Sequence, residues 1–180
     1  YLDKVLVSEK QIQKRVKELG SQISRDYAGQ ELLIVCILRG GVMFTTDLIR
    51  QIDVPLAIEF MGVSSYGTGV RQSEGEVRIT LDLNTSVTGK NILIVEDIID
   101  SGHTLSSVIE ILQTRNPKSV YICTLLDKFE RREVDVPIRY CGFQIKNEFV
   151  FGYGLDMDEY YRNLPFVGTV NLDKYEPPHG

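Results

Sequence analysis

Continuous apolar runs constrain the fold of this 180-residue chain most strongly. Residues 32–38, 91–96 and 119–127 are almost uninterruptedly hydrophobic. Continuous rather than alternating hydrophobicity is typical of strands buried on both faces, as in a parallel sheet. Between these runs, residues 42–52 and 104–115 carry apolar side chains at helical spacing. This alternation predicts an α/β fold, in which a mainly parallel twisted sheet is flanked by helices on both faces.

The other segments complete this pattern. A helix is expected over residues 8–28, because Ser8 and Gln11 have the spacing of a capping box. Strands are expected at 56–63 and, as an alternating edge strand, at 77–83, with one or two more within 140–151. Residues 64–76 form a loop rich in Gly and Ser, and the tail from Asp173 is expected to be irregular. The length favours one domain over residues 1–180.

Composition narrows the class of protein. The net charge of -5 argues against a nucleic-acid partner. Cys36, Cys123 and Cys141 are odd in number and scattered, which favours buried thiols in a reducing compartment over disulfides. His103 and His179 alone cannot form a metal cluster. No apolar run approaches the roughly 20 residues of a membrane span, and no signal peptide is evident, so we expect a cytoplasmic protein.

The architecture predicts where a ligand binds. In open parallel sheets, ligands lie at the carboxyl ends of the strands. The loops expected at that edge are residues 39–41, 97–104 and 127–132. We therefore expect these loops to meet around one site.

One of these loops carries recognisable chemistry. An apolar strand runs into Glu96 and Asp97, and then Asp100 opens a short polar turn, residues 101–104, before a helix. Backbone N–H groups and hydroxyls at a helix N-terminus suit a phosphate group. Acids beside a phosphate make sense if they bind hydroxyls or magnesium. The plain alternative is a helix cap with solvated acids.

Residues 92–104 resemble the phosphoribosyl-pyrophosphate (PRPP) binding signature of the type I phosphoribosyltransferases. The blocks at 38–41, 65–67, 126–128, 149–156 and 159–162 follow in the order of that family's hypoxanthine-guanine branch, so the resemblance covers about residues 5–172. Departures are small: Ser101 stands where Thr is frequent, His103 fills a variable position, and Arg39 stands where Lys also occurs.

The resemblance implies an activity and an architecture. The family has a small hood, built from the N- and C-terminal segments, beside the main sheet. It transfers the phosphoribosyl group of PRPP to hypoxanthine or guanine, which gives IMP or GMP and pyrophosphate, and it depends on Mg²⁺. A homo-oligomer, either a dimer or a tetramer, is expected, with neither a nucleic-acid nor a membrane partner.

The resemblance also assigns the site residues, each by its place in the family's motifs. Asp100 is the expected general base, which accepts the proton from purine N7. PRPP and nucleotide binding falls to Glu96, Asp97, Asp100, Ser101, Gly102, His103 and Thr104, and metal binding to Glu96, Asp97 and Asp156. Purine binding falls to Ile98, Lys128, Phe149 and Val150, and pyrophosphate binding to Arg39, Gly40, Gly41 and Arg162. Ser65 and Tyr66 are expected to belong to a lid that keeps water from the transition state.

Further implications and alternatives remain open. Family members can carry a non-proline cis peptide, which here would join Leu38 and Arg39. Lys128 would select a 6-oxopurine by donating to the oxygen at C6, whereas its plain alternative is a surface lysine. Phe149 could be an ordinary core residue, and Arg162 an exposed charge. A relative that prefers xanthine or guanine is the nearest rival function, and a PRPP-sensing regulator is a more distant one.

Overall fold

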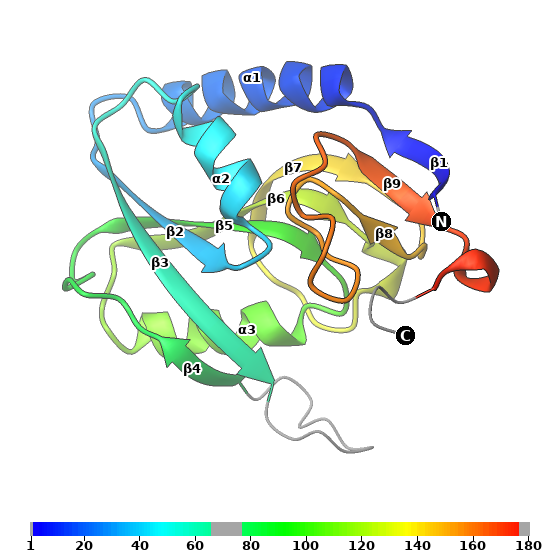
Figure 1. Ribbon diagram of the computed structural model, residues 1–180. Coiled ribbons are helices and arrows are strands. Elements are labelled where there is room, and N and C mark those ends of the chain that lie inside the picture. The colour runs from blue at the N-terminus through cyan, green and yellow to red at the C-terminus, as the bar shows by residue number, and fades with distance from the viewer. Residues whose placement is uncertain (1, 66–76, 177–180) are drawn as a thin grey trace.

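The computed structural model describes residues 2–65 and 77–176, and its centre is a six-stranded sheet (Figure 1). The strand order is β4-β3-β2-β5-β6-β7. All neighbouring strands are parallel except the edge strand β4, which pairs antiparallel with β3. The mainly parallel sheet is therefore confirmed. Its strands are β2 (Leu32–Leu38), β3 (Leu56–Ser65), β4 (Val77–Leu81), β5 (Asn91–Ile99), β6 (Ser119–Asp127) and β7 (Ile138–Gln144).

Helices cover both faces of this sheet (Figure 1). α1 (Glu9–Asp26) and α2 (Val42–Ile49) lie on one face, and α3 (His103–Gln113) lies on the other. Alternate residues of β5 enter different cores: Leu93 and Val95 pack with α1 and α2, whereas Ile92 and Ile94 pack with α3. The continuous apolar run of this strand is explained, because both of its faces are buried.

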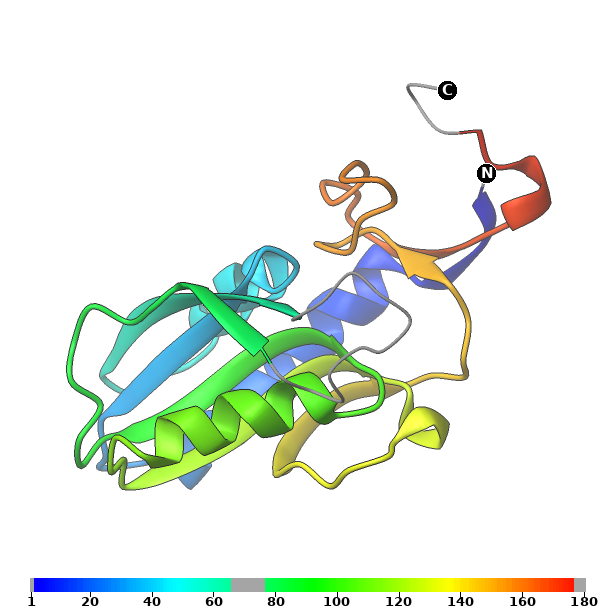
Figure 2. The same cartoon turned by 90° about the horizontal axis from the view of Figure 1, so that it is seen from below.

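A smaller sheet stands beside the main one (Figure 2). It consists of β1 (Leu2–Val7), β9 (Val167–Val170) and β8 (Val150–Phe151) in that order, with both pairings antiparallel. This is the hood of N- and C-terminal segments that the family resemblance implies. β1 and β9 themselves were not foreseen as strands. The side chains of Leu2 and Val5 are nearly half exposed, so β1 lacks the alternation that marks a half-buried strand.

Element boundaries differ from the predictions by a few residues. The capping box is confirmed, since the Gln11 N–H donates to Ser8 Oγ at 3.2 Å and the Ser8 N–H to Gln11 Oε1 at 2.8 Å. The helix that follows ends at Asp26 rather than at residue 28. The helix expected over 42–52 ends at Ile49, followed by a turn, and the one expected over 104–115 spans 103–113. The tail contains one 3-10 turn, η2 (Leu172–Lys174).

The cysteines are free, as expected. Cys36 and Cys123 are buried, whereas Cys141 is only partly buried. Burial raises the pKa of all three thiols, and it raises that of Cys141 to about 11. All three thiols therefore stay protonated near neutral pH. Within residues 2–65 and 77–176, no helix has the length and apolar character that a membrane crossing requires.

Candidate active site

Both adjacent acids lie inside β5, although Asp97 was expected in the loop after it. β5 was predicted to end at residue 96, but its pairing with β6 continues to Ile99. The Asp97 side chain meets the loop after β2, because a Cβ atom on Gly40 would lie only 1.8 Å from Asp97 Oδ2. Glycine is therefore required at this contact. The Leu38–Arg39 peptide in the same loop is cis, a question that the resemblance left open.

The environment of these acids disfavours their charges. Desolvation and the neighbouring Asp97 charge raise the pKa of Glu96 well above its usual range. Desolvation also raises the pKa of Asp97, against the opposing effects of hydrogen bonds and of the Arg162 charge. Two such carboxylates suit a divalent cation, and Mg²⁺ typically takes one or two protein carboxylates plus water and substrate oxygens. In the described part of the chain, no cluster of three or more His, Cys, Asp or Glu forms a complete metal site.

The raised pKa of Glu96 predicts a pH effect on stability. Between its usual and its raised pKa, the folded chain binds more protons than the unfolded chain, so the free energy of unfolding falls as pH rises through that interval. Replacing Glu96 by Gln removes this penalty. We expect Glu96→Gln to melt at a higher temperature than wild type at about pH 8, and the gain to shrink by about pH 4.

Thermal unfolding of the ligand-free proteins at these two pH values measures the effect. Glu130→Gln is the matched control, because Glu130 is exposed and the variant makes the same change of charge. The control should show no comparable gain. A Glu96→Gln variant less stable than wild type at about pH 8 would contradict the prediction.

The polar turn after β5 is shaped by Gly102. This residue has φ +93° and caps α3, and a Cβ atom there would lie 2.8 Å from the Val134 carbonyl oxygen. The backbone N–H groups of Glu133 and Val134 donate to the Ser101 carbonyl at 2.9 and 3.3 Å, so residues 133–134 support the turn. A cavity of about 210 Å³ opens beside it, lined by Glu96, Asp97, Ile98, Ile99, Asp100, Ser101, Gly102, Thr104 and Leu105.

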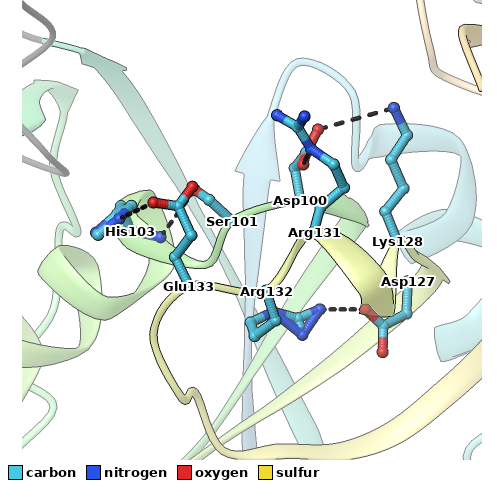
Figure 3. A network of polar contacts seen from close by, with 8 residues as sticks. All are labelled: Asp100, Ser101, His103, Asp127, Lys128, Arg131, Arg132 and Glu133. Carbon is cyan, nitrogen blue, oxygen red and sulfur yellow. Dashed lines mark hydrogen bonds and ion pairs between the residues drawn. The ribbon is translucent and has the colours of Figure 1, made fainter. Parts of the chain in front are cut away.

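His103 stands apart from the other residues of this turn. It is absent from the cavity lining, and its Nε2 lies 3.4 Å from Glu133 Oε1 (Figure 3). The Ser101 hydroxyl accepts a long hydrogen bond from the His103 backbone N–H, at 3.4 Å. The backbone of His103 thus belongs to the turn, while its imidazole turns toward residue 133.

Asp100 lies between two cations at the carboxyl ends of β5 and β6 (Figure 3). Its Oδ1 accepts a hydrogen bond from Arg131 Nε at 2.8 Å, and its Oδ2 lies 3.7 Å from Lys128 Nζ. The hydrogen bond and charge of Asp100 raise the pKa of Arg131. Because the Lys128 side chain is only 12% exposed, it is not the ordinary surface lysine of the plain alternative.

A further loop at the site comes from the hood, and this hood loop runs from Gly152 to Phe166 between β8 and β9. Arg162 Nη1 donates to the Gly154 carbonyl at 2.8 Å, and its Nη2 lies 3.7 Å from Asp156 Oδ1. A Cβ atom on Gly154, which has φ +99°, would lie 2.2 Å from the Gly40 carbonyl oxygen. The hood loop therefore lies directly against residues 39–41. Arg162 is mostly buried, with 22% of its side chain exposed, so it is not the exposed charge of the alternative interpretation.

The remaining described candidates lie in or beside β3, β5 and β8. Ile98 is partly buried in β5, and Val150 is buried in β8. Phe149 precedes β8 and is 51% exposed, so it is not a core residue. Ser65 ends β3, whereas Tyr66 and His179 lie outside the described residues. The expected meeting of the loops at 39–41, 97–104 and 127–132 is confirmed by the contacts of Gly40 with Asp97 and of Asp100 with Arg131.

Sequence reasoning missed several charged neighbours of these candidates. Arg131 was placed in the correct loop, but its contact with Asp100 was not foreseen. Glu159, which pairs with both Arg39 and Arg162, was not assigned a role. Arg132 forms a largely buried ion pair with Asp127 (Figure 3). For Arg131 and Arg132, the only sequence signal was the run of charged residues at 128–133. Such a run does not identify partners until the fold places its loop beside the site.

Known proteins resemble this chain closely. The family model described as "Phosphoribosyl transferase domain" matches residues 6–158. The hypoxanthine phosphoribosyltransferase of Salmonella typhimurium is 52% identical, over 93% of this chain and 95% of the relative. The hypoxanthine-guanine phosphoribosyltransferase of Staphylococcus aureus is 50% identical, over 97% of both chains.

A solved structure supports the same relationship. A crystal structure of a hypoxanthine phosphoribosyltransferase from Staphylococcus aureus superposes with a TM-score of 0.93. Its chain is 49% identical, and the match covers 98% of this chain and 95% of that one. The chain is thus a transferase that belongs to the phosphoribosyltransferase family, within its branch of hypoxanthine and hypoxanthine-guanine phosphoribosyltransferases.

Proposed function

We propose that this transferase moves the 5-phosphoribosyl group of PRPP to hypoxanthine or guanine in a Mg²⁺-dependent reaction. The bond from ribose C1′ to pyrophosphate breaks, a bond from C1′ to the purine forms, and the purine gives up a proton. The observation that carries the proposal is the cavity at the end of β5, which joins the acids Glu96, Asp97 and Asp100 to the turn at the N-terminus of α3.

PRPP binds along this cavity. The 5′-phosphate is bound by Ser101, Gly102, Thr104 and the backbone of His103, because the unpaired N–H groups at a helix N-terminus suit an anion. Glu96 and Asp97 hold the ribose hydroxyls and a Mg²⁺ ion. A bound Mg²⁺ ion would neutralise part of the PRPP charge. The positive charge of the ion would also favour ionisation of Glu96 and Asp97, whose pKa values are raised in the ligand-free chain.

The purine binds on the side of Lys128. Lys128 donates to the oxygen at purine C6, while Asp100 accepts the proton from N7. To do so, the Lys128 ammonium leaves its position 3.7 Å from Asp100, where Arg131 remains as the partner of the carboxylate. Ile98, Phe149 and the Val150 backbone complete the purine site. The half-exposed Phe149 ring is free to stack on a base.

Pyrophosphate binds at the contact between the hood and the loop after β2. Arg39 and Arg162 supply the guanidinium groups, and the Gly40 and Gly41 backbone lies beside them. Asp156 would hold a second Mg²⁺. Ser65 belongs to the lid, whose other expected member, Tyr66, lies outside the described residues. Val7 and Val167 of the hood share a core cluster with Leu93 and Val95 of the main sheet, which supports one domain over residues 1–180.

The test offers hypoxanthine, guanine, xanthine and adenine separately to the protein with PRPP and Mg²⁺, and measures nucleotide formation. We expect turnover with hypoxanthine or guanine and a kcat/KM for adenine lower by a factor on the order of 10², because a C6 amino group presents donors to the Lys128 donor. Chelation of Mg²⁺ should abolish turnover. A protein that binds PRPP yet converts no purine would overturn the proposal in favour of a regulator.

A further inference from the structure

The two arginines of the proposed pyrophosphate site share one carboxylate in the ligand-free chain. Arg39 Nη1 donates to Glu159 Oε2. Arg162 Nη2 lies 3.4 Å from the other oxygen of the same carboxylate, Oε1. Glu159 therefore bridges the loop after β2 and the hood, which are the two segments between which pyrophosphate would bind.

The backbone of the hood loop holds Glu159 in this position. Glu159 has φ +75°, and its neighbours Asp158 and Tyr161 also lie in the left-handed region, at +51° and +73°. Non-glycine residues seldom adopt this conformation, so three of them within four positions define a specific turn. The Glu159 N–H donates to Asp156 Oδ2 at 2.9 Å, and Met157 and Tyr160 exchange backbone hydrogen bonds at 3.0 Å.

This arrangement imitates a bound phosphate in charge and geometry. A carboxylate between two guanidiniums presents oxygens to both, as a phosphate oxyanion would. It is nevertheless a weak contact, since the Arg39 and Glu159 side chains are 72% and 61% exposed. Exposed ion pairs contribute little free energy, so a ligand with more charge can displace this one.

We infer that Glu159 occupies the pyrophosphate arginines in the ligand-free enzyme and must be displaced when pyrophosphate or the pyrophosphate group of PRPP binds. The inference rests on the proposed function, because it takes Arg39 and Arg162 as the pyrophosphate ligands. Displacing Glu159 from the arginines lowers the affinity of the enzyme for pyrophosphate. The displaced carboxylate also stays near the ligand and repels it. Glu159 thereby weakens pyrophosphate binding and favours release of this product.

The test is calorimetric titration of inorganic pyrophosphate into the Mg²⁺-containing enzyme. Glu159→Gln keeps the size of the side chain but removes its charge, and we expect it to bind pyrophosphate about 3–10-fold more tightly than wild type. Glu159→Asp keeps the charge on a shorter arm that cannot reach both arginines, so its affinity should lie between the two. Asp158→Asn makes the same charge change one residue away, and Asp158 bonds to Tyr175 rather than to either arginine. This control should change the affinity less than twofold.

The outcomes separate the inference from the function on which it rests. Equal or weaker binding by Glu159→Gln, beside normal binding by wild type, overturns the inference alone. Equal tightening in Glu159→Gln and Asp158→Asn also overturns it, because the effect would then be one of net charge. A wild-type protein that binds no pyrophosphate and forms no nucleotide overturns both.

Discussion

Replacing Asp100 by Asn is expected to lower kcat for nucleotide formation by a factor on the order of 10²–10⁴, the range typical of a lost general base. An amide has nearly the shape of the carboxylate but accepts no proton from purine N7. The hydrogen bond from Arg131 Nε to Oδ1, at 2.8 Å, can still form in the variant. The KM for PRPP should therefore stay within about threefold of the wild-type value.

Steady-state kinetics with hypoxanthine and PRPP measures both quantities. Arg131→Met is the comparison, because it removes the cation that stays beside Asp100 without removing the carboxylate. It should lower kcat far less than Asp100→Asn does. An Asp100→Asn variant with kcat near that of wild type would show that Asp100 is no base and leave it the structural role of pairing with Arg131 and Lys128.

Replacing Arg132 by Met is expected to cost about 3–5 kcal/mol of the free energy of unfolding. Arg132 pairs with Asp127 at the end of β6, and their side chains are only 17% and 9% exposed. Removal of the cation leaves a buried carboxylate without its partner. The substitution should also destabilise the phosphate-binding turn, because Arg132 packs against it: Arg132 Cδ lies 3.1 Å from the position that a Cβ atom on Gly102 would take.

Urea denaturation followed by circular dichroism tests this stability prediction. Arg131→Met again serves as the control, because the neighbouring Arg131 is half exposed and an exposed ion pair contributes little free energy. A double variant, Arg132→Met with Asp127→Leu, should recover most of the loss, since it leaves no unpaired charge. A loss below about 1 kcal/mol in the single variant would refute the claim that this ion pair supports the turn.

The elements that the sequence predicted well are those with a strong local signal. β2 and β6 begin and end at the predicted residues, because each is a continuous apolar run bounded by polar residues. The Ser8 capping box formed as expected, since it depends only on residues three apart. The order of the strands had no such signal, because side-chain patterns do not say which strand lies beside which.

The site was predictable to the extent that it follows motifs along the chain. The motif at 92–104 located the acids and the turn. It did not show that β5 continues past Glu96, through Asp97 to Ile99, because two charges normally end an apolar strand. Contacts between distant segments, such as Arg39 with Glu159, depend on the left-handed backbone of Asp158, Glu159 and Tyr161. Nothing in these residue types requires that conformation.

The pairing of β1 with β9 has a consequence for how the enzyme is made. Val7 pairs with Val167, so the hood joins residues that leave the ribosome at widely separated times. The strands of the main sheet are complete once residue 144 has emerged, whereas β1 still lacks its neighbour. Arg162 and Asp156 also belong to this late segment. A nascent chain can therefore assemble the PRPP-side turn early, but it gains Arg162 and Asp156, the hood's part of the pyrophosphate side, only after the whole main sheet has emerged.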